Sequence, residues 1–133
     1  TIMANASNYL RSQVGDQWIN GNTVAAPAFL YIALYTDSLN AAGTGTEVTG
    51  GSYVRKSVSD DSFTDDGVGG FTLNTQLEFV DATGSWGTIQ SLGIWDASTG
   101  GNLLVFDDLA ATKVIESGDT FRFNIGAIVI NIS

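Results

Sequence analysis

The chain has 133 residues, which is one domain's worth, and its 44% hydrophobic and 11% aromatic content exceeds that of a disordered chain. Its 5 basic and 14 acidic residues give a net charge of −9, which excludes the cationic face that nucleic acid or an anionic membrane requires. The absence of His and Cys removes the commonest general base, thiolate chemistry and zinc–thiolate sites.

The first predicted element is an amphipathic helix over residues 4–20. Apolar residues recur there at spacings of three and four, which is the period of one helical face: Met3, Ala6, Leu10, Val14 and Trp18. Asn5 or Ser7 would cap its start, and Gly21 stands where a glycine commonly ends a helix. The apolar face needs a cover, which is either the rest of the same domain or a neighbouring subunit.

Residues 28–132 predict a β body within a single domain that spans residues 1–133. The stretch 29–35 is apolar on both faces and predicts a strand buried on both sides. A long polar loop follows at 36–52, and loops of this length often reach a partner. Further strands are expected at 53–58, 71–79, 86–95, 103–106, 114–115, 121–125 and 127–132.

Turn residues recur about every 8–12 residues, which is typical of an antiparallel fold. The prediction is therefore a mainly β protein, an antiparallel sandwich or barrel of about seven or eight strands with one N-terminal helix. The last strand, 127–132, has high β propensity and no charge, so it would aggregate as an unpaired edge. We expect it to lie in the centre of a sheet or under a neighbour.

Carboxylate pairs, Ser–Lys pairs and metals are the remaining options for chemistry. Almost all of the carboxylates occupy predicted turns, where Asp bonds to nearby amides. The cluster Asp60, Asp61, Asp65 and Asp66 is the best calcium candidate. Phe63 interrupts its acidic alternation and no Glu follows at the twelfth position, so it does not match an EF-hand loop. We favour turn carboxylates and predict no catalytic residue, no metal and no cofactor.

Aromatic side chains are the other candidate for binding, because exposed rings stack on sugars. The candidates are Tyr31, Tyr35, Tyr53, Trp86 and Trp95. The alternation around Ile94 points Trp95 away from the core. We favour core or subunit contacts for these rings, and leave a host glycan open as a ligand.

Several segments resemble a known family. They are Leu34-Tyr35-Thr36, the run from Gly45 to Val58, Trp86-Gly87-Thr88, the run from Leu92 to Leu104, and Ser117-Gly118-Asp119. Together they resemble a family of small tailed-bacteriophage virion proteins that are usually labelled tail fibre proteins. The resemblance implies a structural virion protein without catalytic residues.

The expected function is that of a non-enzymatic virion component, found in the virion and assembled in the host cytoplasm, since the first residues lack the layout of a signal peptide. We favour a capsid decoration (cement) protein, with a tail fibre or baseplate subunit that binds host glycan as the alternative. The expected partners are copies of the chain in a homotrimer and the major capsid protein or tail proteins. The predicted contact residues are Met3, Leu10, Val14, Trp18, Arg55, Lys56 and Trp95.

Overall fold

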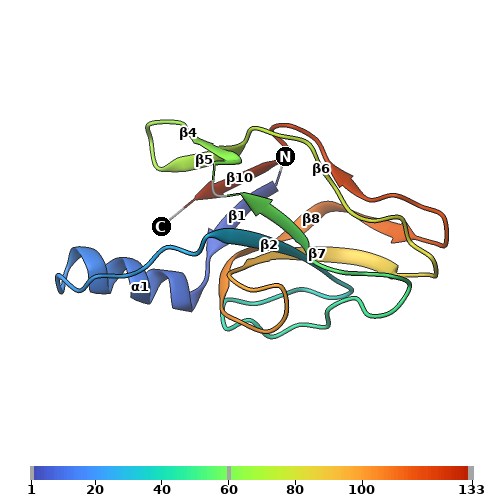
Figure 1. Ribbon diagram of the computed structural model, residues 1–133, viewed down its shortest axis with the longest axis horizontal. Helices are drawn as coiled ribbons and strands as arrows, with labels where there is room; N and C mark the ends of the chain where they lie inside the picture. Colours follow the sequence, from blue (N-terminus) through green and yellow to red (C-terminus); the bar gives the residue numbers. More distant parts are fainter. Residues whose placement is uncertain (1, 60, 132–133) are drawn as a thin grey trace.

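The structure, a computed structural model, describes residues 2–59 and 61–131. These residues form one helix and ten strands: β1 (Ile2–Ala6), α1 (Asn8–Trp18), β2 (Phe29–Tyr35), β3 (Lys56–Ser59), β4 (Phe63–Asp65), β5 (Gly70–Leu73), β6 (Leu77–Glu78), β7 (Gly87–Trp95), β8 (Leu103–Ile115), β9 (Arg122–Phe123) and β10 (Ile128–Asn131). Eight strands make one curled sheet in the order β3-β2-β7-β8-β1-β10-β5-β4, and β6 pairs with β9 (Figure 1). The predicted mainly β class with one helix near the N-terminus is confirmed.

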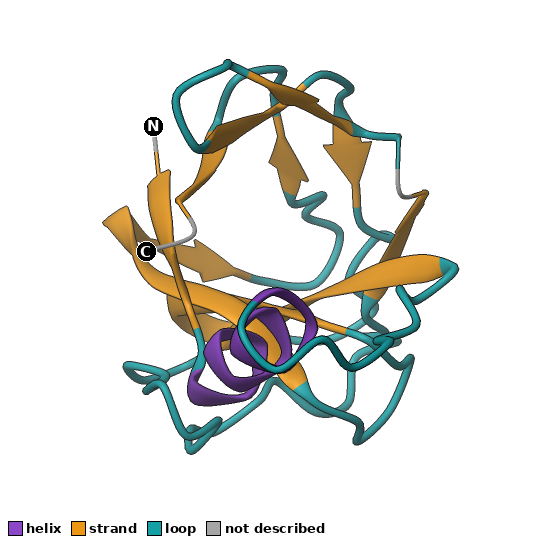
Figure 2. Cartoon of the chain, turned by 90° about the vertical axis from the view of Figure 1, so that its left-hand side faces the viewer, coloured by secondary structure: helices purple, strands orange, loops and turns teal. Residues whose placement is uncertain are grey.

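The two edge strands of the large sheet, β3 and β4, follow each other in the chain with only residues 60–62 between them. The Ser62 amide donates to the Ser59 carbonyl at 3.1 Å. Because the edges are joined by so short a link, the sheet has to curl round until they approach each other, as Figure 2 shows. This curl gives the sheet an inner face, which holds the core, and an outer face.

The uncharged last strand lies in the interior of the sheet. β10 pairs in parallel with β1 and antiparallel with β5, so both of its edges are bonded. The expectation of a central strand is confirmed for Ile128–Asn131, whereas Ile132 lies outside the described residues. The parallel pairing with β10 makes β1 part of the large sheet, although the two strands lie far apart in the sequence.

That pairing corrects the predicted helix. The segment Ile2–Ala6 is a strand in which alternate residues are buried, and the helix begins only at Asn8 and ends at Trp18. Ser7 is extended and caps the helix, because its hydroxyl accepts from the Leu10 amide at 3.1 Å. Met3 therefore belongs to β1, where it is half exposed, and not to the helical face.

Strand boundaries differ in further places. The predicted strand 53–58 is β3, which covers Lys56–Ser59. The predicted strand 71–79 breaks after Leu73, and β6 leaves the large sheet to pair with β9. The predicted strands at 103–106 and 114–115 are one strand, β8. β4 was not predicted, because its short run is rich in Asp and looks like a turn.

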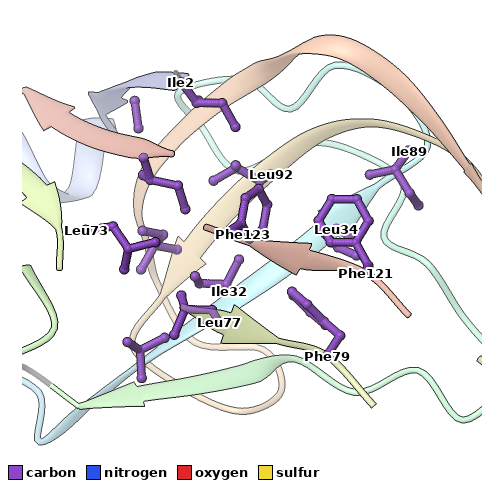
Figure 3. Packing of buried hydrophobic residues seen from close by; sticks show 14 of the residues in the cluster. Ile2, Ile32, Leu34, Leu73, Leu77, Phe79, Ile89, Leu92, Phe121 and Phe123 are labelled. Carbon is purple, nitrogen blue, oxygen red and sulfur yellow. The ribbon is translucent and has the colours of Figure 1, made fainter. Parts of the chain in front are cut away.

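The core fills the space between the inner face and the β6–β9 pair (Figure 3). Ile89, Leu92 and Ile94 of β7 point inward as predicted, and each is at most 1% exposed. Aromatic rings at the ends of β6 and β9 pack edge to face within this core, with the Phe79 and Phe121 centroids 5.8 Å apart. Each such side chain stabilises the fold by roughly 1.5–3 kcal/mol, so the inner face supplies most of the driving force for folding.

Candidate functional site

The long loop after β2 folds back over the outer face of the sheet. We call residues 36–48 the flap. Leu39 of the flap is buried on this face, and the Ser91 hydroxyl donates to the Asp37 carbonyl at 2.5 Å and accepts from the Leu39 amide at 3.1 Å. Val48, at the end of the flap, is buried in the main core. The flap therefore packs on its own sheet, and β2 is covered on both faces from Ile32 to Tyr35.

Gly93, in the middle of β7, leaves room for the flap. A Cβ at this position would lie 2.6 Å from Leu39 Cδ2 and 2.9 Å from Leu103 Cδ1. Both distances are shorter than side chains tolerate, so any larger residue would push the flap off the outer face. The glycine is therefore what allows a second, smaller core of Ala33, Tyr35, Leu39 and Leu103 on this side.

Arg55 joins the flap to the β7–β8 hairpin. Its Nε and Nη2 donate to Glu47 Oε2 and Oε1, each at 2.9 Å, and its Nη1 donates to the carbonyls of Ala97 and Gly100, both at 2.9 Å. The guanidinium carbon lies 4.6 Å from the ring centroid of Trp95. The Arg55 side chain is only 6% exposed. We call Arg55 with these partners the clasp.

Two tyrosines border the clasp. The Tyr53 hydroxyl donates to Glu47 Oε2 at 2.8 Å and accepts from the Leu34 amide at 2.9 Å. Burial raises the Tyr53 pKa far above its usual range, and the Glu47 charge adds to this. Burial, followed by the Glu47 charge, likewise raises the pKa of Tyr35 to about 12. Both phenols are therefore neutral at physiological pH, and the Glu47 charge is matched by Arg55.

Three of the predicted contact residues, Arg55, Trp95 and Lys56, lie in or next to the clasp. The donors of Arg55 are engaged within the chain, so an acidic partner would have to displace Glu47. Trp95 is half-buried beneath the guanidinium, and Lys56 is half-buried in β3. Burial alone would lower the Arg55 pKa, but the Glu47 carboxylate raises it overall. This arrangement is a structural lock between the flap and the β7–β8 hairpin.

The acidic cluster shapes the β4–β5 hairpin. Asp65 Oδ1 accepts from the Gly67 amide at 2.8 Å, and Asp66 Oδ1 accepts from Val68 at 2.8 Å and from Gly70 at 3.0 Å. Within residues 2–59 and 61–131, no group of three or more acidic residues is placed to hold a metal ion. Asp60, the first residue of the predicted cluster, lies outside the described residues.

Two of the candidate sugar-stacking rings are buried. Trp86 is 3% exposed, and its Nε1 donates to the Gly51 carbonyl at 2.9 Å. Tyr35 is 2% exposed under the flap. Neither ring presents a face to solvent. Trp86 packs in the main core, and Tyr35 packs in the second core under the flap.

The second surface is built on α1. We call residues 8–28 the arm, which comprises α1 and the segment that returns to β2. The base of the arm is fixed, because the Ser7 amide donates to the Leu104 carbonyl at 2.8 Å and the Asn8 amide to the Ala41 carbonyl at 3.0 Å. The Ser7 hydroxyl also donates to the Leu103 carbonyl. Beyond this base, α1 extends past the sheet (Figure 1).

The far end of the arm has little cover. No residue of α1 is buried, and the predicted face runs from half-buried Leu10 and Val14 to Trp18, which is 78% exposed. Ile19 is 83% exposed beside it. A groove of about 450 Å³ opens between α1 and the returning segment 24–27. Three of the predicted contact residues, Leu10, Val14 and Trp18, thus line one groove.

Charge and aromatic exposure both separate the arm from the body. The chain holds 5 basic and 14 acidic residues, and Arg11 and Asp16 are the only ones within residues 1–36, which leaves residues 37–133 with 4 basic and 13 acidic. Among the described residues, the exposed aromatic side chains all lie in that first part: Tyr9, Trp18 and Phe29. Our sequence reasoning missed Ile19 and Phe29, although the uncharged run 17–36 marks them.

Comparison with known families gives one match. Residues 5–131 match the family described as podophage GP4 fiber I protein gp80. The search of curated proteins found no match. The helix in the described part of the chain has 11 residues, fewer than a membrane span requires.

Proposed function

Because the chain belongs to the family described as podophage GP4 fiber I protein gp80, we propose that it is a fibre subunit of a podophage virion. The protein is a phage fibre-type structural protein. The observation that carries the finer proposal is the extent of the match, residues 5–131, which takes in both the arm and nearly all of the β body. The description therefore applies to the chain as a whole.

The family description favours the fibre over the capsid. The sequence favours a capsid decoration protein, because a single compact acidic domain with one N-terminal helix suits a capsid lattice. A fibre subunit makes equal use of those features, since an arm that extends past the sheet suits attachment to any neighbour. The family description adds weight to the fibre alone.

A purely mechanical role fits the chemistry of the chain. With no His and no Cys, catalysis would depend on carboxylates. Those of Asp65 and Asp66 hold the β4–β5 turn, and that of Glu47 is paired with Arg55 and Tyr53. The two sheet edges that face each other, the flap and the clasp give a closed body with short edges, which suits a particle exposed to proteases.

Electron cryo-microscopy of the intact phage particle tests the proposal. We expect density that fits the curled sheet and its projecting helix in a fibre attached to the tail. Gold-labelled antibody against the purified chain should mark the same place. Density for this fold on the capsid lattice, with none in the fibres, would overturn the fibre assignment and return the protein to capsid decoration.

A further inference from the structure

The arm has the composition of an interface, whereas the body has the composition of a solvated surface. Interface cores are depleted in charge and enriched in aromatic residues and Met. From Gln17 to Thr36 the chain has no charged residue. The arm carries exposed Trp18 and Ile19, and exposed Phe29 follows it as the first residue of β2. The remaining exposed large apolar side chains of the described residues include single aliphatic ones in body turns, such as Val68.

We propose that the arm is the docking site for a second copy of this chain, with the Trp18–Ile19 end of one arm seated in the groove of the other. The groove is lined by Leu10, Val14 and Val24, among others, and has room for large apolar side chains. An amphipathic helix that lays its apolar face into a hydrophobic groove is a common mode of recognition. Each arm supplies both the groove and the side chains.

The distribution of charge favours a second copy over a basic partner as the occupant of the arm. A basic partner would be drawn to the body, which carries the whole net charge of −9, and not to the neutral arm. Two copies repel each other wherever their bodies meet, but their arms carry one basic and one acidic residue each. Arm-to-arm contact is therefore the approach with the least like-charge repulsion.

The dimensions support the same arrangement. The 11 residues of α1 span about 16 Å at 1.5 Å per residue. Charges further apart than about 8 Å are largely screened at physiological ionic strength. Bodies held apart by the arms thus repel each other weakly. Stable interfaces use about 20–30 residues a side, and the arm supplies close to the lower number.

Sedimentation velocity and light scattering on the purified chain test the proposal. We expect a mass that is a multiple of 14.0 kDa at a chain concentration near 100 μM, and that falls on dilution. The double variant Trp18→Ser, Ile19→Ser should weaken association at least 10-fold. The matched control is Val68→Ser, which removes a side chain that is 87% exposed in the β4–β5 turn and should leave the mass unchanged.

Salt and fluorescence give readouts that do not depend on how a variant folds. Lowering the ionic strength to about 10 mM lengthens the screening distance to about 30 Å, so association should weaken. Iodide should quench the wild-type tryptophan fluorescence more strongly on dilution, because Trp18 becomes exposed while Trp86 stays buried.

Two results would overturn the proposal. One is a wild-type mass of 14.0 kDa at every concentration and salt level. This is the result expected if the arm binds a different virion protein and not a second copy. The other is a folded double variant that associates as strongly as the wild type. The proposal concerns the isolated chain and does not depend on where the protein sits in the virion.

Discussion

Trp86 in the β body and Trp18 in the arm are the same residue type in opposite environments. Trp86 is 3% exposed, contacts the Tyr53 ring at a centroid distance of 5.4 Å and donates its N–H to a carbonyl. Trp18 is 78% exposed on a helix without a buried residue. The body thus buries this residue type in its core, whereas the arm leaves it exposed.

The largest expected effect separates the two tryptophans. Trp86→Ala should lower the free energy of unfolding by about 3–5 kcal/mol, because it empties a large space in the core. Trp18→Ala should change the stability of the monomer by no more than about 0.5 kcal/mol. Urea unfolding, followed by circular dichroism at low protein concentration, measures both. Equal losses in the two variants would mean that the arm is part of the core.

The clasp offers a second contrast, between two ion pairs of the body. Arg55→Lys should cost about 2–4 kcal/mol, because Lys cannot bond Glu47 through two nitrogens and also reach both carbonyls. The control is Arg122→Lys, since the Arg122–Glu78 pair is 3.6 Å apart and about half exposed. That exchange should cost about 0–0.5 kcal/mol. Similar losses of unfolding free energy for the two variants in urea titrations would contradict a stabilising role for the clasp.

Alkaline pH should weaken the outer face of the body. The folded-state pKa of Tyr35 is about 12 and its ordinary value is 10.0, so the unfolded chain loses its proton first. The stabilisation is complete below pH 10 and is lost as the pH rises towards 12, by about 2 kcal/mol. Thermal unfolding between pH 8 and 12 measures this loss. Tyr35→Phe should show a shallower decline, and an identical decline would exclude Tyr35 as its source.

The smallest expected effects compare two glycines. Gly93→Ala should cost about 1–2 kcal/mol, because its Cβ would overlap Leu39 of the flap. Gly15→Ala in α1 should stabilise by about 0.5–1 kcal/mol, since no atom lies within 4 Å of its Cβ and alanine favours helix. Thermal unfolding of both variants checks the opposite signs.

The order of apolar and polar residues was sufficient to predict the strands in which burial is continuous or alternates from one residue to the next. The apolar run at 29–35 gave β2 with its bounds, and the alternation in β7 gave Ile89, Leu92 and Ile94 as inward residues. The uncharged last strand was correctly expected in the interior of a sheet. In these segments the side chains themselves carry the free energy of burial, so the sequence alone identifies them.

The same kind of pattern failed where two periods overlap. Met3 and Ala6 fit a helical spacing, yet Ile2, Ala4 and Ala6 also alternate, and the parallel pairing with β10 decides for a strand. No local rule contains that partner, which lies more than 120 residues away in the chain. The candidate site shows the same limit, because the sequence suggested Arg55 as a contact for a neighbour and its Glu47 partner is brought to it by the flap.

The sequence by itself determined the class of fold, the excess of negative charge and the apolar face of α1. The tertiary structure alone decided that the base of this face is covered and its end is not. It also decided that the clasp closes internally. The physical reason is that exposure depends on which distant segments pack together, and long-range packing is set by the whole curled sheet and not by neighbours in sequence.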